Sequence, residues 1–139
     1  MLIFLIFIFI FFINLFFIES ISKAAFPTGE IKLNKINSEK FQIHYKIKKG
    51  TWAGFGFGES MKNADINYII VDSFGKFDLH DTFSFGHGRP KDDKDQGGTF
   101  DFENIRSFKG NNDFINIIFE RKFDTKDKFD KKLEPVNII

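Results

Sequence analysis

The sequence predicts an all-β fold, an antiparallel immunoglobulin-like β-sandwich preceded by an N-terminal signal helix. The clearest observation is the segment Phe41–Lys48, in which apolar and polar residues alternate strictly. That two-residue period is typical of a strand with one buried face. Glycine-containing turns separate seven or eight such short segments, and no segment after the N-terminal one has a helical period. Short strands at this spacing favour a sandwich.

The predicted strands lie between residues 30 and 123. They are Glu30–Lys35, Phe41–Lys48, Thr51–Phe57, Asp65–Val71, Lys76–Leu79, Thr99–Phe108 and Phe114–Phe123. We expect the second and third to form a hairpin about Lys49-Gly50, and the last two to form another about residues 109–112. Residues 86–98 are expected to be a loop, because they combine four glycines and a proline with many charges.

The N-terminal segment predicts export. Residues 2–18 are apolar except for Asn14, and Ser22-Lys23-Ala24 supplies the small residues of a cleavage site before Ala25. Residues 1–24 are therefore expected to be a signal peptide, which places the protein outside the cell or in the lumen of the secretory pathway. The alternative is an uncleaved membrane anchor, since about 17 apolar residues lie at the short limit for spanning a bilayer.

Composition argues against two further properties. The 20 Lys and Arg residues nearly balance the 19 Asp and Glu residues, for a formal charge of +1, and no basic cluster is present. A nucleic-acid-binding surface would need such a cluster, so no nucleic-acid partner is expected. The chain has no cysteine, so the exported domain is not held by disulfides.

An ordered set of motifs resembles the DOMON domain family of β-sandwiches. The set comprises Trp52–Phe57, the stretch from Ser60 to Asp65, Asp81, Pro90, the stretch from Ile117 to Arg121, and the Asp-rich stretch 124–130. The resemblance covers about Glu39–Leu133, which makes residues 25–38 a linker and first strand and 134–139 a tail. It leaves open whether the sandwich lacks one or two C-terminal strands of the family; the open sheet edge would then invite a protein partner.

Several residues of this set have predicted structural roles. Trp52 is expected to anchor the core through its large apolar area. Arg121 follows an apolar strand and needs a carboxylate partner, for which Asp124, Asp127 and Asp130 are the candidates. The stretch 93–98 lacks the ligand spacing of a calcium loop, and no metal site is expected there.

The resemblance implies two binding roles, because some DOMON domains hold a b-type haem and others are thought to recognise sugars or other small ligands. Met61 matches the methionine that binds haem iron, but the matching histidine would lie beyond Asp130, where this chain has none. His44, His80 and His87 do not align with that position. We therefore expect a recognition module without a cofactor, and keep a haem-binding electron-transfer domain with Met61 as axial ligand as the alternative.

The ligand is expected at the Gly-interleaved strand or at the loop that follows Asp81. The residues proposed to contact a small molecule or sugar are Trp52, Gly54, Gly56, Met61 and Asp81. No Ser–His–Asp order, cysteine nucleophile or metal-spaced histidine pair is present in the sequence. These observations favour binding over catalysis.

Overall fold

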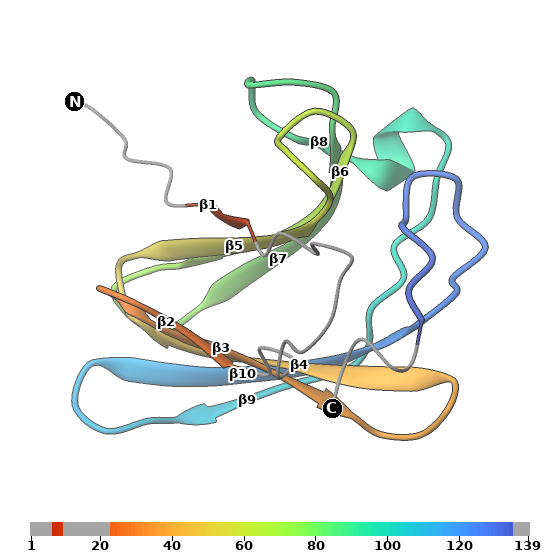
Figure 1. Cartoon of the computed structure of the whole chain (residues 1–139). Helices are drawn as coiled ribbons and strands as arrows, with labels where there is room; N and C mark the ends of the chain where they lie inside the picture. The colour runs from red at the N-terminus through yellow and green to blue at the C-terminus, as the bar shows by residue number, and fades with distance from the viewer. Residues whose placement is uncertain (1–6, 10–22, 135–139) are drawn as a thin grey trace.

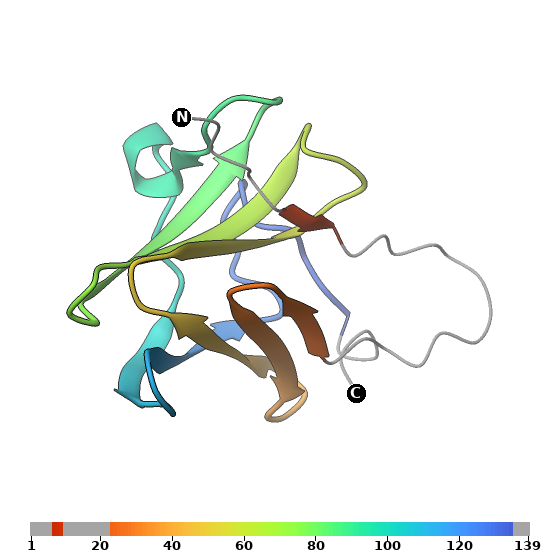
Figure 2. The ribbon, with the colours of Figure 1, turned by 90° about the vertical axis from the view of Figure 1, so that its left-hand side faces the viewer.

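The computed structural model describes residues 7–9 and 23–134, which form a sandwich of two five-stranded sheets (Figure 1). The first sheet has the order β1 (Phe7–Phe9), β5 (Trp52–Phe57), β6 (Ala64–Val71), β7 (Phe77–Ser84), β8 (Lys91–Asp92). The second has the order β2 (Lys23–Phe26), β3 (Gly29–Lys35), β4 (Lys40–Lys48), β10 (Phe114–Lys122), β9 (Glu103–Lys109). Figure 2 shows the sheets as two separate layers, with β1 at the edge of one of them. The predicted antiparallel sandwich is confirmed.

The predicted hairpin between β4 and β5 is wrong, because these strands belong to different sheets. β4 pairs with β3 and β10, whereas β5 pairs with β1 and β6. The Lys49-Gly50 turn carries the chain from one layer to the other, and Gly50 adopts a positive φ of 74° there. Alternation of apolar residues shows that each strand has a buried face, but it does not show which sheet contains that face.

The hairpin of β9 and β10 is confirmed, with Ile117 opposite Ser107 in the register. Strand β7 is longer than predicted and extends through Ser84, so Asp81 lies within a strand. The segment predicted as loop contains β8 and the 3₁₀ helix η1 (Asp93–Gln96), which ends at Gly97 with φ 85°. Figure 1 shows η1 beside the C-terminal segment at one end of the sandwich.

Most of the predicted signal segment lies outside the described residues. Within it, Phe7–Phe9 forms strand β1, which runs parallel to β5 with Phe7 opposite Gly54. The predicted cleavage point between Ala24 and Ala25 falls inside β2. In the ranges 7–9 and 23–134, no helix has the length and apolar character needed to cross a membrane.

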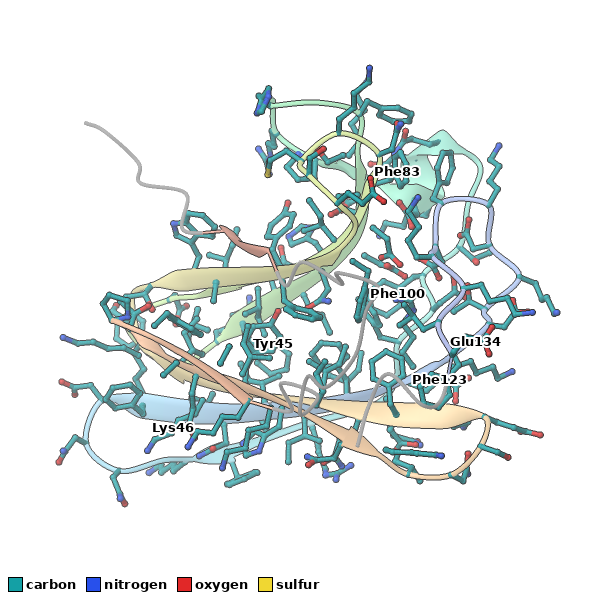
Figure 3. All side chains as sticks on the ribbon, in the orientation of Figure 1. Tyr45, Lys46, Phe83, Phe100, Phe123 and Glu134 are labelled. Atoms are coloured by element: carbon teal, nitrogen blue, oxygen red, sulfur yellow. The ribbon has the colours of Figure 1, made fainter. Side chains whose placement is uncertain are left out.

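The core consists mainly of the inward faces of β3, β4, β5, β6 and β10. Phe41, Ile43, Tyr45 and Ile47 are fully buried, as their alternation predicts. Burying such a side chain contributes about 1.5–3 kcal/mol. Figure 3 shows Tyr45 between the layers, where its hydroxyl donates a hydrogen bond to Asn67 Oδ1 of the opposite sheet at 2.5 Å.

Trp52 does not anchor this core, so that expectation is wrong. Strand β5 directs Ala53, Phe55 and Phe57 inward. Trp52 is only partly buried and lies on the opposite face, which it shares with the two glycines of the strand. The period of two fixes this outcome, because three apolar residues on one face outweigh one on the other.

Candidate functional site

Four aspartates and one arginine occupy the end of the sandwich near η1, and we call them the acidic cluster: Asp65, Asp81, Asp93, Asp130 and Arg121. Side-chain oxygens of Asp65, Asp81 and Asp130 all lie within 4.8 Å of one another. The side chains of Asp65 and Asp130 are 3% and 2% exposed, and Asp93 is fully buried. Figure 3 shows oxygen atoms gathered between the layers near Phe100.

One of the predicted partners of Arg121, Asp130, is confirmed, and Asp65 is a second partner that was not predicted. Its Nη2 lies 2.8 Å from Asp65 Oδ2 and 3.6 Å from Asp130 Oδ2, and it donates a hydrogen bond to the Lys131 carbonyl. The guanidinium also stands over the Phe57 ring, 5.4 Å from its centroid. Asp65 is thus the closer partner, supplied by the neighbouring sheet.

Asp124 and Asp127 are not partners of Arg121, so those two expectations are wrong. Asp124 pairs with Lys126 at 2.7 Å and with Lys132 at 3.7 Å. Asp127 accepts hydrogen bonds from the backbone N–H groups of Thr99 and Phe129. The contacts with Lys126 and Phe129 lie within local turns, as in Asx turns, whereas Thr99 reaches Asp127 from a distant part of the chain.

The electrostatics of the acidic cluster are unfavourable to full ionisation. Burial, together with the negative charge of Asp130, raises the pKa of Asp81 to about 8, and the same two causes raise the pKa of Asp93 to about 8. Burial raises the pKa of Asp130 to about 6, with Arg121 opposing the shift. Burial also raises the pKa of Asp65 despite its contact with Arg121. One guanidinium does not balance four buried carboxylates.

A second polar arrangement lies on the outer face of the first sheet. The Tyr68 and His80 rings stack across β6 and β7 with centroids 4.4 Å apart and an angle of 12° between planes. His80 Nδ1 lies 3.0 Å from Asp92 Oδ1, and its Nε2 lies 3.0 Å from Asp78 Oδ2. The imidazole is therefore held in one orientation by carboxylates on both sides.

Two hollows border this stacked pair and share Asp92. The larger, of about 490 Å³, is lined by Tyr68, Arg89, Pro90, Lys91, Asp92, Asp95 and Gln96. The smaller, of about 180 Å³, is lined by Asp78, Leu79, His80, Asp81, Asp92, Lys94 and Phe100. We call the stacked rings with Arg89, Asp92 and Gln96 the outer-face site. A volume of several hundred cubic ångströms is typical of a small-molecule site.

Three of the predicted ligand residues lie near this site along the sheet. Gly54 pairs with Tyr68, so Gly54, Tyr68 and His80 form one row across β5, β6 and β7. Trp52 and Gly56 share the same face of β5. Asp81 lines the smaller hollow but points inward and belongs to the acidic cluster. Met61, in the β5–β6 loop, lines neither hollow.

The haem that the family implies does not fit the contacts of these residues. An iron ligand needs a free ring nitrogen, but both ring nitrogens of His80 face carboxylates. His44 Nε2 lies 2.8 Å from Asn116 Oδ1 on the outer face of the second sheet. Met61 is partly exposed, and no described contact joins it to a histidine.

Sequence reasoning missed Asp65, Asp93, Tyr68 and His80. For Asp65 a signal was present, because the alternation of β6 places it on the same face as Asn67, Ile69 and Val71. A carboxylate on an inward face predicts a buried partner such as Arg121. The burial of Asp93 depends on how η1 packs against β7, and no local pattern predicts that packing.

The fold and these sites define a β-sandwich module with two hollows beside the outer face of its first sheet. The family model of the DOMON domain matches residues 30–139, and the chain belongs to the DOMON domain family. Members of this family are ligand-binding or haem-binding modules, typically extracellular or lumenal. No curated protein and no solved structure matches the chain.

Proposed function

We propose that this DOMON domain is a non-catalytic recognition module that binds a sugar or a similar polyhydroxylated small molecule at the outer-face site. The observation that carries the proposal is the fixed Tyr68–His80 stack beside a hollow of about 490 Å³. A rigid aromatic pair offers a flat apolar contact to the C–H face of a sugar ring at little entropic cost.

The polar residues around the stack match the hydroxyl groups of such a ligand. The Asp92 carboxylate accepts hydrogen bonds and the Arg89 guanidinium donates them. The Gln96 amide oxygen also accepts them, while its Nε2 donates to the carbonyls of Lys91 and Asp92. The Arg89 guanidinium lies beside the Tyr68 hydroxyl, which places a donor at the rim of the hollow. A few oriented polar groups around an apolar surface are what specificity for a small ligand requires.

The contacts of His80 support a binding role over a catalytic one. A histidine that activates a nucleophile needs a hydroxyl or thiol at one ring nitrogen and an orienting group at the other. His80 has a carboxylate at each. This arrangement holds the ring in place, and among the described residues neither ring nitrogen faces a hydroxyl or thiol.

The test is a screen of the purified protein against mono- and oligosaccharides, followed by calorimetric titration of the best binder. We expect Tyr68→Ala and His80→Ala each to weaken binding about tenfold or more, since each removes part of the stack. His44→Ala is the matched control, because His44 lies on the outer face of the other sheet, beside Phe108. Unchanged affinity in both stack variants would refute the proposal.

A haem-binding function is tested on the same material. After incubation with haem, a Soret band that disappears in Met61→Ala would favour the electron-transfer alternative over the recognition module. If the protein retains neither a sugar nor haem, a protein partner at a sheet edge becomes the function to test, through main-chain pairing.

We also propose that the N-terminal segment exports the domain and is removed between Ala24 and Ala25. The support is the apolar run followed by small residues at the spacing of a cleavage site. Mass spectrometry of secreted material is expected to give an N-terminus at Ala25. Recovery of chains beginning at Met1 from the membrane fraction would show an anchor instead.

A further inference from the structure

The acidic cluster brings together more carboxyl groups than its protein contacts satisfy. Asp65, Asp81 and Asp130 approach one another closely, and Arg121 pairs with the first and last of them. Asp81 accepts one hydrogen bond, from the Asp101 N–H at 2.8 Å. Removing charged carboxylates from water is costly unless each is paired or coordinated.

Several oxygens of the cluster are buried without a partner. Within residues 7–9 and 23–134, Asp81 Oδ1, Asp130 Oδ1 and both carboxylate oxygens of Asp93 have no hydrogen bond. Asp81 is 3% exposed and Asp93 0%. Asp93 belongs to η1, which packs against β7, the strand that contains Asp81. Native proteins rarely leave such groups unsatisfied, so each indicates something that would complete it.

We propose that the acidic cluster is a calcium site in which Asp81, Asp93 and Asp130 supply the ligand oxygens and Asp65 links the site to Arg121. Calcium takes six to eight oxygen ligands at about 2.3–2.6 Å in flexible geometry. Two oxygens on one such ion are at most about 5 Å apart, and one side-chain oxygen each from Asp65, Asp81 and Asp130 lies within 4.8 Å of the others.

The donor set selects calcium over other common metals. Zinc favours cysteine and histidine, whereas the grouped ligands are all carboxylates. Magnesium demands a near-ideal octahedron and keeps several waters, whereas this site is buried between the sheets and η1. The smaller hollow, which Asp81 also lines, connects the site to solvent.

The site draws its ligands from elements that no calcium-loop motif connects. Asp81 comes from β7, Asp93 from η1, and Asp130 from the segment after β10. Our expectation of no metal at residues 93–98 rested on the spacing of a continuous loop. A single aspartate of that stretch suffices here, because the other ligands come from distant positions in the sequence.

Calorimetric titration of the chelator-treated full-length protein with calcium chloride tests the proposal. We expect one binding event per chain and, at saturating calcium, a rise in melting temperature of roughly 5–10 °C. The same concentration of magnesium chloride is expected to give a much smaller rise. Equal responses to both salts, or no heat with calcium, would overturn the proposal in favour of carboxyls that are kept protonated.

Variants of the two aspartates in η1 separate a specific site from general charge effects. Asp93→Asn removes a buried ligand, and Asp95→Asn removes an exposed carboxylate two residues away. We expect at least a tenfold loss of calcium affinity in the first and none in the second. Asp81→Asn provides a second test should Asp93→Asn fail to fold. Full affinity in a folded Asp93→Asn or Asp81→Asn variant would contradict the assignment.

Discussion

The middle of the sandwich and its end near η1 are equally buried but are stabilised in opposite ways. In the middle, Phe41, Ile43 and Ile47 are fully removed from water and pack against other apolar side chains. At the end, Arg121 is 1% exposed and faces carboxylates. The apolar middle gains free energy from burial itself, whereas the polar end needs each charge to be matched. A sandwich can thus be stable in one half and dependent on a bound ion in the other.

The largest effect is expected from an apolar truncation in the middle. Phe41→Ala leaves a cavity beside Phe57 and Phe123 and should lower the free energy of unfolding by about 3–5 kcal/mol. Urea denaturation measures the change. Phe74→Ala is the control, since Phe74 is 90% exposed and its truncation should change stability by less than about 0.5 kcal/mol. A loss below about 1 kcal/mol for Phe41→Ala would mean that the core is not close-packed there.

Removal of one partner of the ion pair at the polar end should lower the free energy of unfolding by nearly as much. Arg121→Leu leaves the Asp65 carboxylate buried without its ion-pair partner, which should cost about 3 kcal/mol at neutral pH without calcium. Adding Asp65→Asn should restore part of this loss, because the uncompensated charge is then removed. If the double variant is no more stable than Arg121→Leu, the ion pair is not the reason for the loss.

The two regions should also respond differently to pH. Calcium-free protein is expected to lose stability as pH rises from 5 to 7, by about 1.4 kcal/mol per pH unit for each of two carboxyls, or up to about 2.7 kcal/mol per pH unit together. The cause is that the pKa values of Asp81 and Asp93 are raised to about 8 in the folded protein, so unfolding releases protons that the folded state holds. This stability is fully present below the ordinary carboxyl pKa and is lost toward pH 8.

Charged groups surround those two carboxyls on several elements, and all contribute to the pH response. They are Asp65, Asp101, Arg121, Asp127, Asp130 and Lys131. Thermal melts at pH 5, 6 and 7 in the presence of a chelator measure the slope. Asp81→Asn and Asp93→Asn should each flatten it, and an unchanged slope in both would show that other groups titrate.

The smallest effect is expected at the hydrogen bond that joins the two layers. Tyr45→Phe leaves Asn67 Oδ1 without the donor that lies 2.5 Å away, inside an otherwise apolar region. The expected loss is about 1–2 kcal/mol, the usual cost of an unsatisfied buried acceptor. If Tyr45→Phe leaves the free energy of unfolding unchanged, water reaches Asn67. The contrast between the two regions would then be weaker.

The sequence predicted the apolar region better than the polar one for a physical reason. Burial of Phe41, Ile43, Tyr45 and Ile47 follows from local alternation, which any strand with one inward face must show. The pairing of Arg121 with Asp65 depends on which sheet each strand joins. The prediction of a β4–β5 hairpin placed these two strands in the same sheet, whereas they belong to different sheets.

The outer-face site could likewise be predicted only in part from the alternation of residues along single strands. Trp52, Gly54 and Gly56 could be placed on one face of β5 by counting alternate residues. Tyr68 and His80 meet only through the register of β6 with β7, which places them opposite each other. Asp92 reaches His80 because β8 adds to the edge of β7, and a two-residue strand carries too little pattern to be predicted.

The position of β10 has a consequence for the order in which the chain acquires structure. Strands β5, β6, β7 and β8 pair in sequence order, so the first sheet can form from neighbouring segments. The second sheet has β10 between β4 and β9, with Phe114 opposite Lys48. Strands β2, β3 and β4 also pair in sequence order, but β4 has only one of its two neighbours until β10 has been synthesised. Closing the long loop between β4 and β10 makes that last pairing slow. Ribosome-bound chains that end before Phe114 should therefore leave one edge of β4 unprotected while β6, between β5 and β7, is already protected on both edges.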